Sequence, residues 1–175
     1  YYDKIFNSIF LTSLELSSNK ITNITALGNA LATNTSLEIL MLDKNQITDI
    51  TALGNALVTN ASLTYLGLRD NLITNITSLG NALVTNTTLK DLCIYNNRIT
   101  NIRALGNALA TNSTLGLLML NGNQITDITP LSNALATNTI LKILWLSEYL
   151  LTREDNEIIK TAWKRRDLGR LILNF

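Results

Sequence analysis

The 175-residue chain contains no histidine, one cysteine and one proline, and these shortages narrow what it can do. Without histidine, neither a Ser-His-Asp nor a Cys-His catalytic arrangement can form, so the sequence predicts no catalytic residues and no enzyme. Cys93 has no partner for a disulfide within the chain and no companion ligand for a metal, so no metal site and no cofactor is expected. These shortages favour a binding function.

The chain also lacks a large net charge and a long apolar run. A formal net charge of +1 creates no general attraction for nucleic acid or for an anionic membrane surface. No stretch approaches the roughly 18 apolar residues that a spanning helix needs, so no membrane contact is expected. The C-terminal basic residues suit the end of a helix better than a nucleic-acid surface; they are Lys160, Lys164, Arg165, Arg166 and Arg170.

What the chain does contain is a repeated segment, L-x-x-L-x-L-x-x-N, in six successive copies. The first copy runs from Leu11 to Asn19. In the last copy, from Leu141 to Tyr149, a tyrosine stands in place of the final asparagine. The asparagines of the other copies are 26 residues apart; they are Asn19, Asn45, Asn71, Asn97 and Asn123. A fixed period of this length is typical of solenoids, in which stacked repeats share a core that one repeat cannot form alone.

This segment is the leucine-rich repeat signature, and the chain resembles leucine-rich repeat proteins over nearly all of its length. The resemblance implies an α/β fold, a right-handed leucine-rich repeat solenoid (horseshoe) with a parallel β-sheet on the concave face and short helices on the convex face. The I-T-D-I part of the repeat is similar to the internalin type, and the A-L-x-x-N part to the ribonuclease-inhibitor type. A 26-residue repeat lies between these types and leaves the curvature open.

Each repeat supplies local predictions. The final asparagine is expected to be buried, to bond backbone groups of its own turn and the next one, and to stack into a structural ladder. Leu27, Ala30 and Leu31 have the spacing of one buried helix face. Helix N-caps are predicted at Thr25, Thr51, Thr77 and Thr129, with Pro130 in a first turn. Helix ends in the left-handed conformation are predicted at Asn34, Asn60, Asn86, Asn112 and Asn138.

The domain prediction places leucine-rich repeats over residues 1–151, with a partial first repeat at 1–10, and a C-terminal cap over 152–175. The cap should consist of a helix, acidic in its first turn and basic at its end, followed by a terminal strand. Trp163 is expected to cover the last face of the core. Because the chain starts inside a repeat without a polar cap, we expect a fragment of a longer protein.

The repeats are near copies, so the positions that differ among them point to function. The differences concentrate at the third, fifth, seventh and eighth positions of the L-x-x-L-x-L-x-x-N frame, which should face the concave side. Residue types enriched at interfaces occur there. The predicted partner-binding surface consists of Ile39, Met41, Tyr65, Arg69, Tyr95, Leu117, Met119, Ile143 and Trp145. Leu117, Met119, Ile143 and Trp145 should be lateral neighbours in a patch that monomers seldom leave bare, with Trp145 open to solvent.

The sequence thus predicts a monomeric module that recognises a partner protein through its concave sheet, as part of a larger effector or intracellular sensor. The alternative is a structural scaffold whose apolar patch drives homo-oligomerisation, for example as a homodimer. Asp43 and Arg69, on neighbouring strands, should form an exposed ion pair worth roughly 0–1 kcal/mol. A lone cysteine favours a reducing compartment, and we expect the bacterial or host cytosol, with secretion in a larger chain left open.

Overall fold

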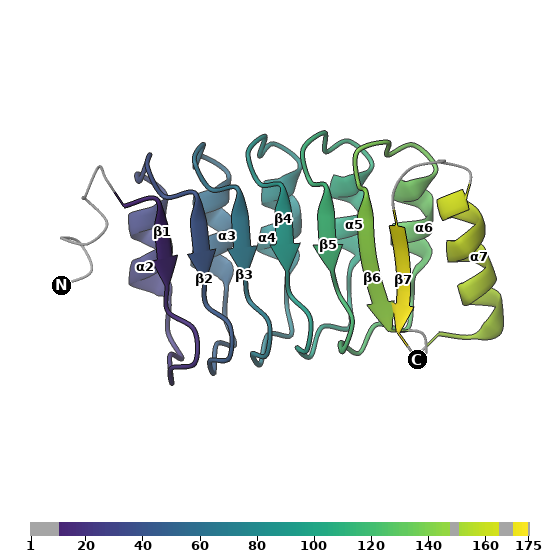
Figure 1. Cartoon of the computed structure of the whole chain (residues 1–175), viewed down its shortest axis with the longest axis horizontal. Helices are drawn as coiled ribbons and strands as arrows, with labels where there is room; N and C mark the ends of the chain where they lie inside the picture. The colour runs from purple at the N-terminus through teal and green to yellow at the C-terminus, as the bar shows by residue number, and fades with distance from the viewer. Residues whose placement is uncertain (1–10, 148–150, 165–169, 175) are drawn as a thin grey trace.

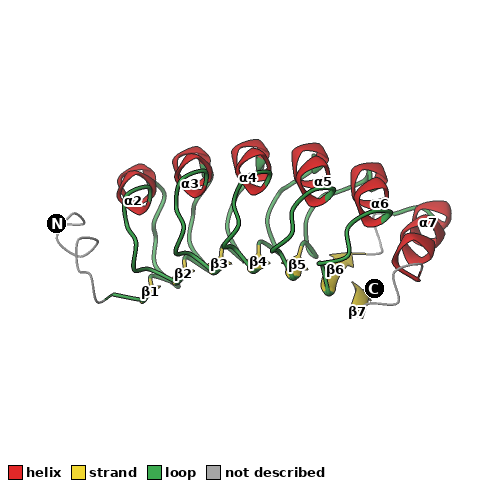
Figure 2. Cartoon of the chain, turned by 90° about the horizontal axis from the view of Figure 1, so that it is seen from above, coloured by secondary structure: helices red, strands yellow, loops and turns green. Residues whose placement is uncertain are grey.

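The structure, a computed structural model, describes residues 11–147, 151–164 and, for the backbone, 170–174. These residues form two layers, a sheet of parallel strands and a row of helices (Figure 1). Seen from above, the strands line the inner side of a shallow arc and the helices its outer side (Figure 2). The predicted α/β solenoid with a concave sheet is confirmed. The predicted partial repeat at 1–10 and Tyr149 lie outside the described residues.

The described part of the sheet has seven parallel strands in the order of the sequence. They are β1 (Ser13–Glu15), β2 (Ile39–Met41), β3 (Tyr65–Gly67), β4 (Asp91–Cys93), β5 (Leu117–Met119), β6 (Ile143–Ser147) and β7 (Arg170–Asn174). From β1 to β6 the register is constant, so that Leu40 pairs with Leu66 and Leu66 with Leu92. These central leucines are fully buried, because side chains alternate along a strand and the middle one faces the helices.

The outer layer consists of short helices. They are α2 (Thr25–Leu31), α3 (Thr51–Leu57), α4 (Thr77–Leu83), α5 (Arg103–Leu109), α6 (Thr129–Leu135) and the longer α7 (Arg153–Lys164). The first five have seven residues each and depend on packing, since isolated helices of this length are marginal. Leu27 and Leu31 are buried and Ala30 is half-buried, as the predicted face requires, and Pro130 lies in the first turn of α6.

The predicted threonine N-caps are wrong. Thr25, Thr51, Thr77 and Thr129 are the first residues of their helices, and none of these helices has a side-chain bond from its N-cap residue. Instead an asparagine or aspartate two residues before each helix start accepts the N–H of the first helical residue at 2.8–2.9 Å. The side chains of Asn and Asp are short enough to bond their own backbone two residues on, which makes an Asx turn.

The predicted left-handed helix ends are also wrong. Positive φ angles do not occur at Asn34, Asn60, Asn86, Asn112 or Asn138, but at the eighth position of the frame, in Ser18, Lys44, Asp70, Asn96 and Gly122. The asparagines after the helices form a second buried ladder. Asn60 Nδ2 donates to the carbonyls of Leu31 and Asn34, both at 2.9 Å, and its Oδ1 accepts the N–H of Leu63 at 2.8 Å. Asn86, Asn112 and Asn138 repeat these bonds.

The ladder after the strands is confirmed, with one correction. Asn71 Nδ2 donates to the carbonyls of Leu68 in its own turn (3.1 Å) and Leu42 in the preceding one (3.0 Å), while its Oδ1 accepts the N–H of Ile47 (3.0 Å). The amide therefore joins its turn to the preceding repeat and not to the next. Asn45, Asn97 and Asn123 do the same, whereas the exposed Asn19 bonds within its own turn.

A glycine in each of α2 to α5 sets the close spacing of the helix row. An added Cβ at Gly80 would lie 2.7 Å from backbone atoms of Ala104 and Leu105 in α5, where nothing can move aside easily. The corresponding glycines, Gly28, Gly54 and Gly106, approach the next helix in the same way. In α6 the position is taken by Ser132, which lines a groove of about 440 Å³ between α6 and α7.

The chain after β6 contains the predicted helix and strand. Thr152 and Asp155 exchange hydrogen bonds at the start of α7, which is acidic in its first turn and ends at Lys164. Trp163 is 7% exposed and belongs to the core, as expected. β7 pairs with β6 in parallel. The division into repeats over 1–151 and a cap over 152–175 stays a prediction.

Candidate functional site

The predicted partner-binding residues lie on the concave face or at the strand ends beside it. β2 provides Ile39 and Met41, β3 provides Tyr65, β5 provides Leu117 and Met119, and β6 provides Ile143 and Trp145, while Arg69 and Tyr95 follow β3 and β4. All nine side chains are half-buried, neither sealed in the core nor fully exposed. Their role in binding stays a prediction.

Neighbouring strands carry an apolar patch, defined as Leu117, Met119, Ile143 and Trp145. The register pairs Leu117 with Ile143 and Met119 with Trp145, so the predicted lateral pairs are confirmed. Trp145 is half-buried, so less of it is open to solvent than the sequence suggested. The register thus places four apolar side chains next to one another across β5 and β6.

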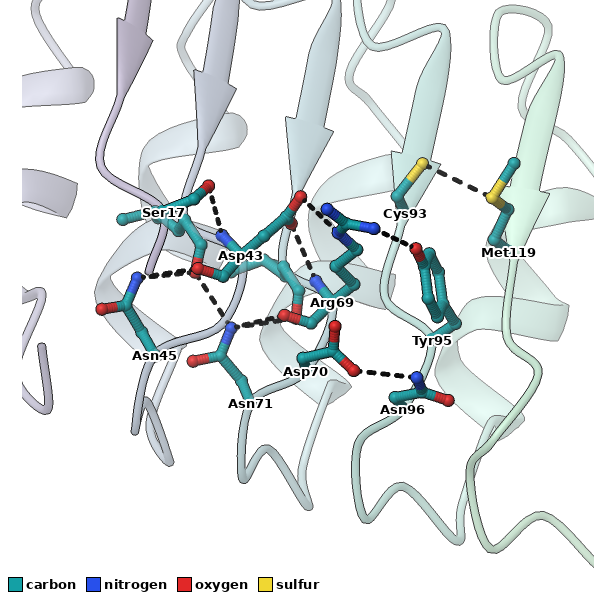
Figure 3. Close-up of polar contacts among 12 residues, drawn as sticks. Ser17, Asp43, Asn45, Arg69, Asp70, Asn71, Cys93, Tyr95, Asn96 and Met119 are labelled. Atoms are coloured by element: carbon teal, nitrogen blue, oxygen red, sulfur yellow. Dashed lines mark hydrogen bonds and ion pairs between the residues drawn. The ribbon is translucent and has the colours of Figure 1, made fainter. Parts of the chain in front are cut away.

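A row of hydrogen bonds crosses the sheet at the seventh position of the frame (Figure 3). Ser17 Oγ accepts the backbone N–H of Asp43 at 3.1 Å. The carboxylate of Asp43 accepts the backbone N–H of Arg69 at 3.0 Å and its Nε at 2.9 Å. Arg69 donates onward from Nη1 to the hydroxyl of Tyr95 at 2.7 Å, and its guanidinium carbon lies 5.8 Å from the centre of the Tyr95 ring. We call these four residues the polar row.

The ion pair predicted between Asp43 and Arg69 is present, and its arginine side chain is exposed as predicted, but its carboxylate is not. Asp43 is only 6% exposed, because Gly67 leaves room for its carboxylate; an added Cβ there would lie 2.8 Å from Oδ1. Burial raises the pKa of Asp43, and this outweighs the hydrogen bonds and charge of Arg69, which lower it. The hydrogen bond to Tyr95 in turn raises the pKa of Arg69. The pair therefore joins a buried carboxylate to an arginine side chain that is 38% exposed.

Tyr65, Cys93 and Met119 pack together on the strands next to the polar row. Burial raises the pKa of the Tyr65 phenol, as does its hydrogen bond to Cys93, and burial also raises the pKa of the Cys93 thiol. Cys93 Sγ lies 3.7 Å from Met119 Sδ (Figure 3). A buried, protonated thiol is unreactive, so Cys93 serves packing. Among the described residues, no three His, Cys, Asp or Glu side chains gather where they would hold a metal ion.

Comparison with solved structures places this architecture among known folds. Internalin C2 from Listeria monocytogenes matches over 98% of this chain and 74% of its own, with a TM-score of 0.64 at 22% identity. Pollen receptor kinase 3 matches over 94% and 73% (TM-score 0.61, 18% identity), and leiomodin-1 actin-binding site 2 over 89% and 80% (TM-score 0.57, 19% identity). The chain has the leucine-rich repeat fold. No protein-family model and no curated protein sequence matches it.

Sequence reasoning missed how this leucine-rich repeat sheet uses its seventh position. It predicted the Asp43–Arg69 pair, but not that Ser17 and Tyr95 extend this pair into a row of hydrogen bonds. The signal was present in the chain, since Ser, Asp, Arg and Tyr follow one another in register and Gly67 replaces a larger residue beside Asp43. No helix in the described ranges is both long and apolar enough to cross a membrane.

Proposed function

We propose that this leucine-rich repeat chain is a non-catalytic module that binds a partner protein through its concave sheet. The observation that carries the proposal is the apolar patch on β5 and β6, in which four large apolar side chains lie together on the concave face and none is sealed in the core. Soluble monomers seldom expose such a patch without a use for it. Tryptophan and methionine within it are residue types enriched at protein interfaces.

A contrast between the two faces supports the same proposal. The helices repeat nearly the same sequence, TALGNAL in α2 and α3 and TSLGNAL in α4, because each helix must fit its neighbours. The concave positions of the same repeats differ in charge, size and polarity. Packing explains the constancy of the helices, and selection for a partner explains the diversity of the strands. One structural neighbour, leiomodin-1, is described as an actin-binding site, so in that protein a similar fold belongs to a binding region.

The experiment compares Trp145→Ala with Val84→Ala on the opposite face. Val84 is 53% exposed on the helix side, so its loss leaves the concave face intact. Proteins captured by the intact chain should still bind Val84→Ala, whereas Trp145→Ala should bind at least about thirtyfold more weakly, the effect of losing about 2 kcal/mol at an interface anchor. Equal binding by both variants would contradict the concave site.

Stability must be measured on the same variants. Trp145 is half-buried, so Trp145→Ala should cost clearly less free energy of unfolding than the roughly 3–5 kcal/mol of a core tryptophan. Trp163→Ala, a core change, provides that reference and should cost about the full amount. If Trp145→Ala unfolds the chain as Trp163→Ala does, the patch is structural.

The alternative function is a scaffold in which the apolar patch joins two copies of the chain. Light scattering on the intact chain distinguishes the two functions. A monomer that captures a partner agrees with the proposal, whereas a dimer that Trp145→Ala dissociates favours the scaffold.

The buried Cys93, which forms no disulfide, suits a reducing compartment such as the cytosol, with the module contained in a larger effector or sensor.

A further inference from the structure

The charges on the concave sheet differ in whether they have partners. Glu15 accepts the backbone N–H of Ser17 at 2.8 Å, and Asp70 accepts the side-chain amide of Asn96 at 2.8 Å. Asp43 is bonded to Arg69 within the polar row. Asp91 differs from all of these, because in the described part of the chain its carboxylate forms no hydrogen bond and no ion pair; the positive charge of the adjacent Lys90 lowers its pKa, but burial raises the pKa by more.

The surroundings of Asp91 make this unpaired charge unfavourable. It occupies the middle of the sheet on β4, with Tyr65 beside it on β3 and Leu117 beside it on β5. Cys93, which is buried, lies two residues further along the same face. Between β2 and β6 the third and fifth positions of the frame are otherwise uncharged; they are Ile39, Met41, Tyr65, Gly67, Cys93, Leu117, Met119, Ile143 and Trp145.

We propose that Asp91 is the recognition point for a lysine or arginine side chain of the partner protein, next to the apolar patch. The inference rests on the proposed function and specifies the chemistry of the partner. A half-buried carboxylate has already lost part of its hydration in the free chain, so a cation that joins it gains more than it would at an exposed carboxylate. The ring of Tyr65, on the adjacent strand, provides an aromatic neighbour that also favours a cation.

Arg69 does not offer a comparable site for an acidic partner. Its guanidinium is already bonded to Asp43 and to the Tyr95 hydroxyl, and its charge is balanced by the carboxylate. A partner carboxylate at Arg69 would compete with those bonds. Charge complementarity on this face therefore favours a basic side chain at Asp91.

The position of Asp91 relative to the apolar patch sets a spacing in the partner. β4, β5 and β6 are consecutive in the sheet (Figure 1), and Asp91 pairs with Leu117, which pairs with Ile143 of the patch, so Asp91 and Ile143 are two strand spacings apart, roughly 10 Å at about 4.8 Å per strand. An extended chain covers that distance in about three residues. The occupant is therefore a protein segment with a basic residue about three positions from an apolar or aromatic residue.

The test selects random linear peptides, displayed on phage, against the intact chain and against its Asp91→Asn variant. Peptides selected on the intact chain should share a lysine or arginine at that spacing from an apolar residue. A synthetic selected peptide should bind Asp91→Asn about tenfold or more weakly. Replacing its basic residue with glutamine should weaken binding to the intact chain but not to Asp91→Asn. Because Asp91 has no bond to lose, Asp91→Asn should unfold at the same or a higher urea concentration.

Other outcomes separate this inference from the proposed function. Peptides that require Trp145 but bind equally to Asp91→Asn would overturn the inference and leave the concave binding site standing. Binding that neither Trp145→Ala nor Asp91→Asn weakens, or a selection that enriches no peptide, would count against both. Self-association of the intact chain that Asp91→Asn abolishes would make the occupant a second copy and overturn the assignment to a partner protein.

Discussion

Asn71→Ala tests the ladder because the structure shows which bonds this change removes. Asn71 is 4% exposed and its Oδ1 is the acceptor for the N–H of Ile47, which is fully buried. The carbonyls that its Nδ2 contacts have second donors, since Leu42 also accepts from Asn45 at 3.0 Å and Leu68 from Asn97 at 2.9 Å. The alanine variant therefore leaves one buried group, the N–H of Ile47, without a partner.

The expected loss follows from that single group. An unsatisfied buried donor costs roughly 1–3 kcal/mol, so Asn71→Ala should lower the free energy of unfolding by about 2 kcal/mol in urea melts. Asn19→Ala is the matched control, because Asn19 is exposed and the carbonyl of Leu16 keeps a bond from Asn45 at 3.0 Å. Its loss should stay within about 0.5 kcal/mol. Equal losses at the two sites would refute the ladder as the source of the effect.

The ladder also predicts coupling between neighbouring rungs. In the Asn71→Ala/Asn97→Ala double variant, the carbonyl of Leu68 loses both of its side-chain donors, which neither single variant does. The double variant should therefore cost about 1 kcal/mol more than the sum of the single ones. Strict additivity in the same urea melts would show that the carbonyl of Leu68 does not couple the two asparagines energetically.

Three further predictions concern the helix row, the ion pair and an Asx turn. Gly80→Ala should destabilise by roughly 1–3 kcal/mol because its Cβ would meet backbone atoms of α5, whereas Ser132→Ala at the matching position should be nearly neutral in the same melts. Arg69→Ala should lower the free energy of unfolding by roughly 1–3 kcal/mol, which is more than the loss of an exposed ion pair and less than the loss of a buried one, because only the carboxylate of Asp43 is buried. A loss near zero would contradict the burial of Asp43. The pKa of Asp49 is lowered by the hydrogen bonds from the first residue of α3, so its contribution to stability is complete above a pH of about 3.9 and is lost as pH falls through the lowered pKa. Asp49→Asn, which keeps an acceptor oxygen but lacks the charge, should be less stable than the intact chain at pH 7, and the difference should disappear in acid, where Asp49 is protonated.

The parts of the fold that follow from period and alternation were predictable. The spacing of the leucines requires strands in constant register, and a ladder of asparagines follows because each one recurs at the same place in the stack. The helix boundaries were harder to predict, since a threonine that begins a helix and a threonine that caps one look alike in sequence. Only the hydrogen bond that the N–H of Thr25 donates to Asn23 Oδ1 shows that the capping side chain is two residues earlier.

The candidate site was predictable as a surface but not in its internal bonds. Register alone placed Met119 beside Trp145. Whether Asp43 is exposed depends on Gly67, a residue of the next repeat, whose missing side chain admits the carboxylate. Single-position reasoning cannot weigh such a pair, because the free energy of burying a charge depends on what the neighbouring strand leaves open. The same holds for Asp91, whose lack of a partner is a property of its neighbours.

If the proposed site is correct, the concave face separates rigidity from recognition by position in the frame. At the seventh position, Asp43 and Arg69 are held by each other, so a partner would have to break their bonds to use them. At the third and fifth positions, residues such as Leu117 and Trp145 contact their lateral neighbours through apolar surface, which a partner can extend without breaking a bond. Binding energy should therefore concentrate on the strands β4 to β6, where a partner gains contacts and the fold loses none.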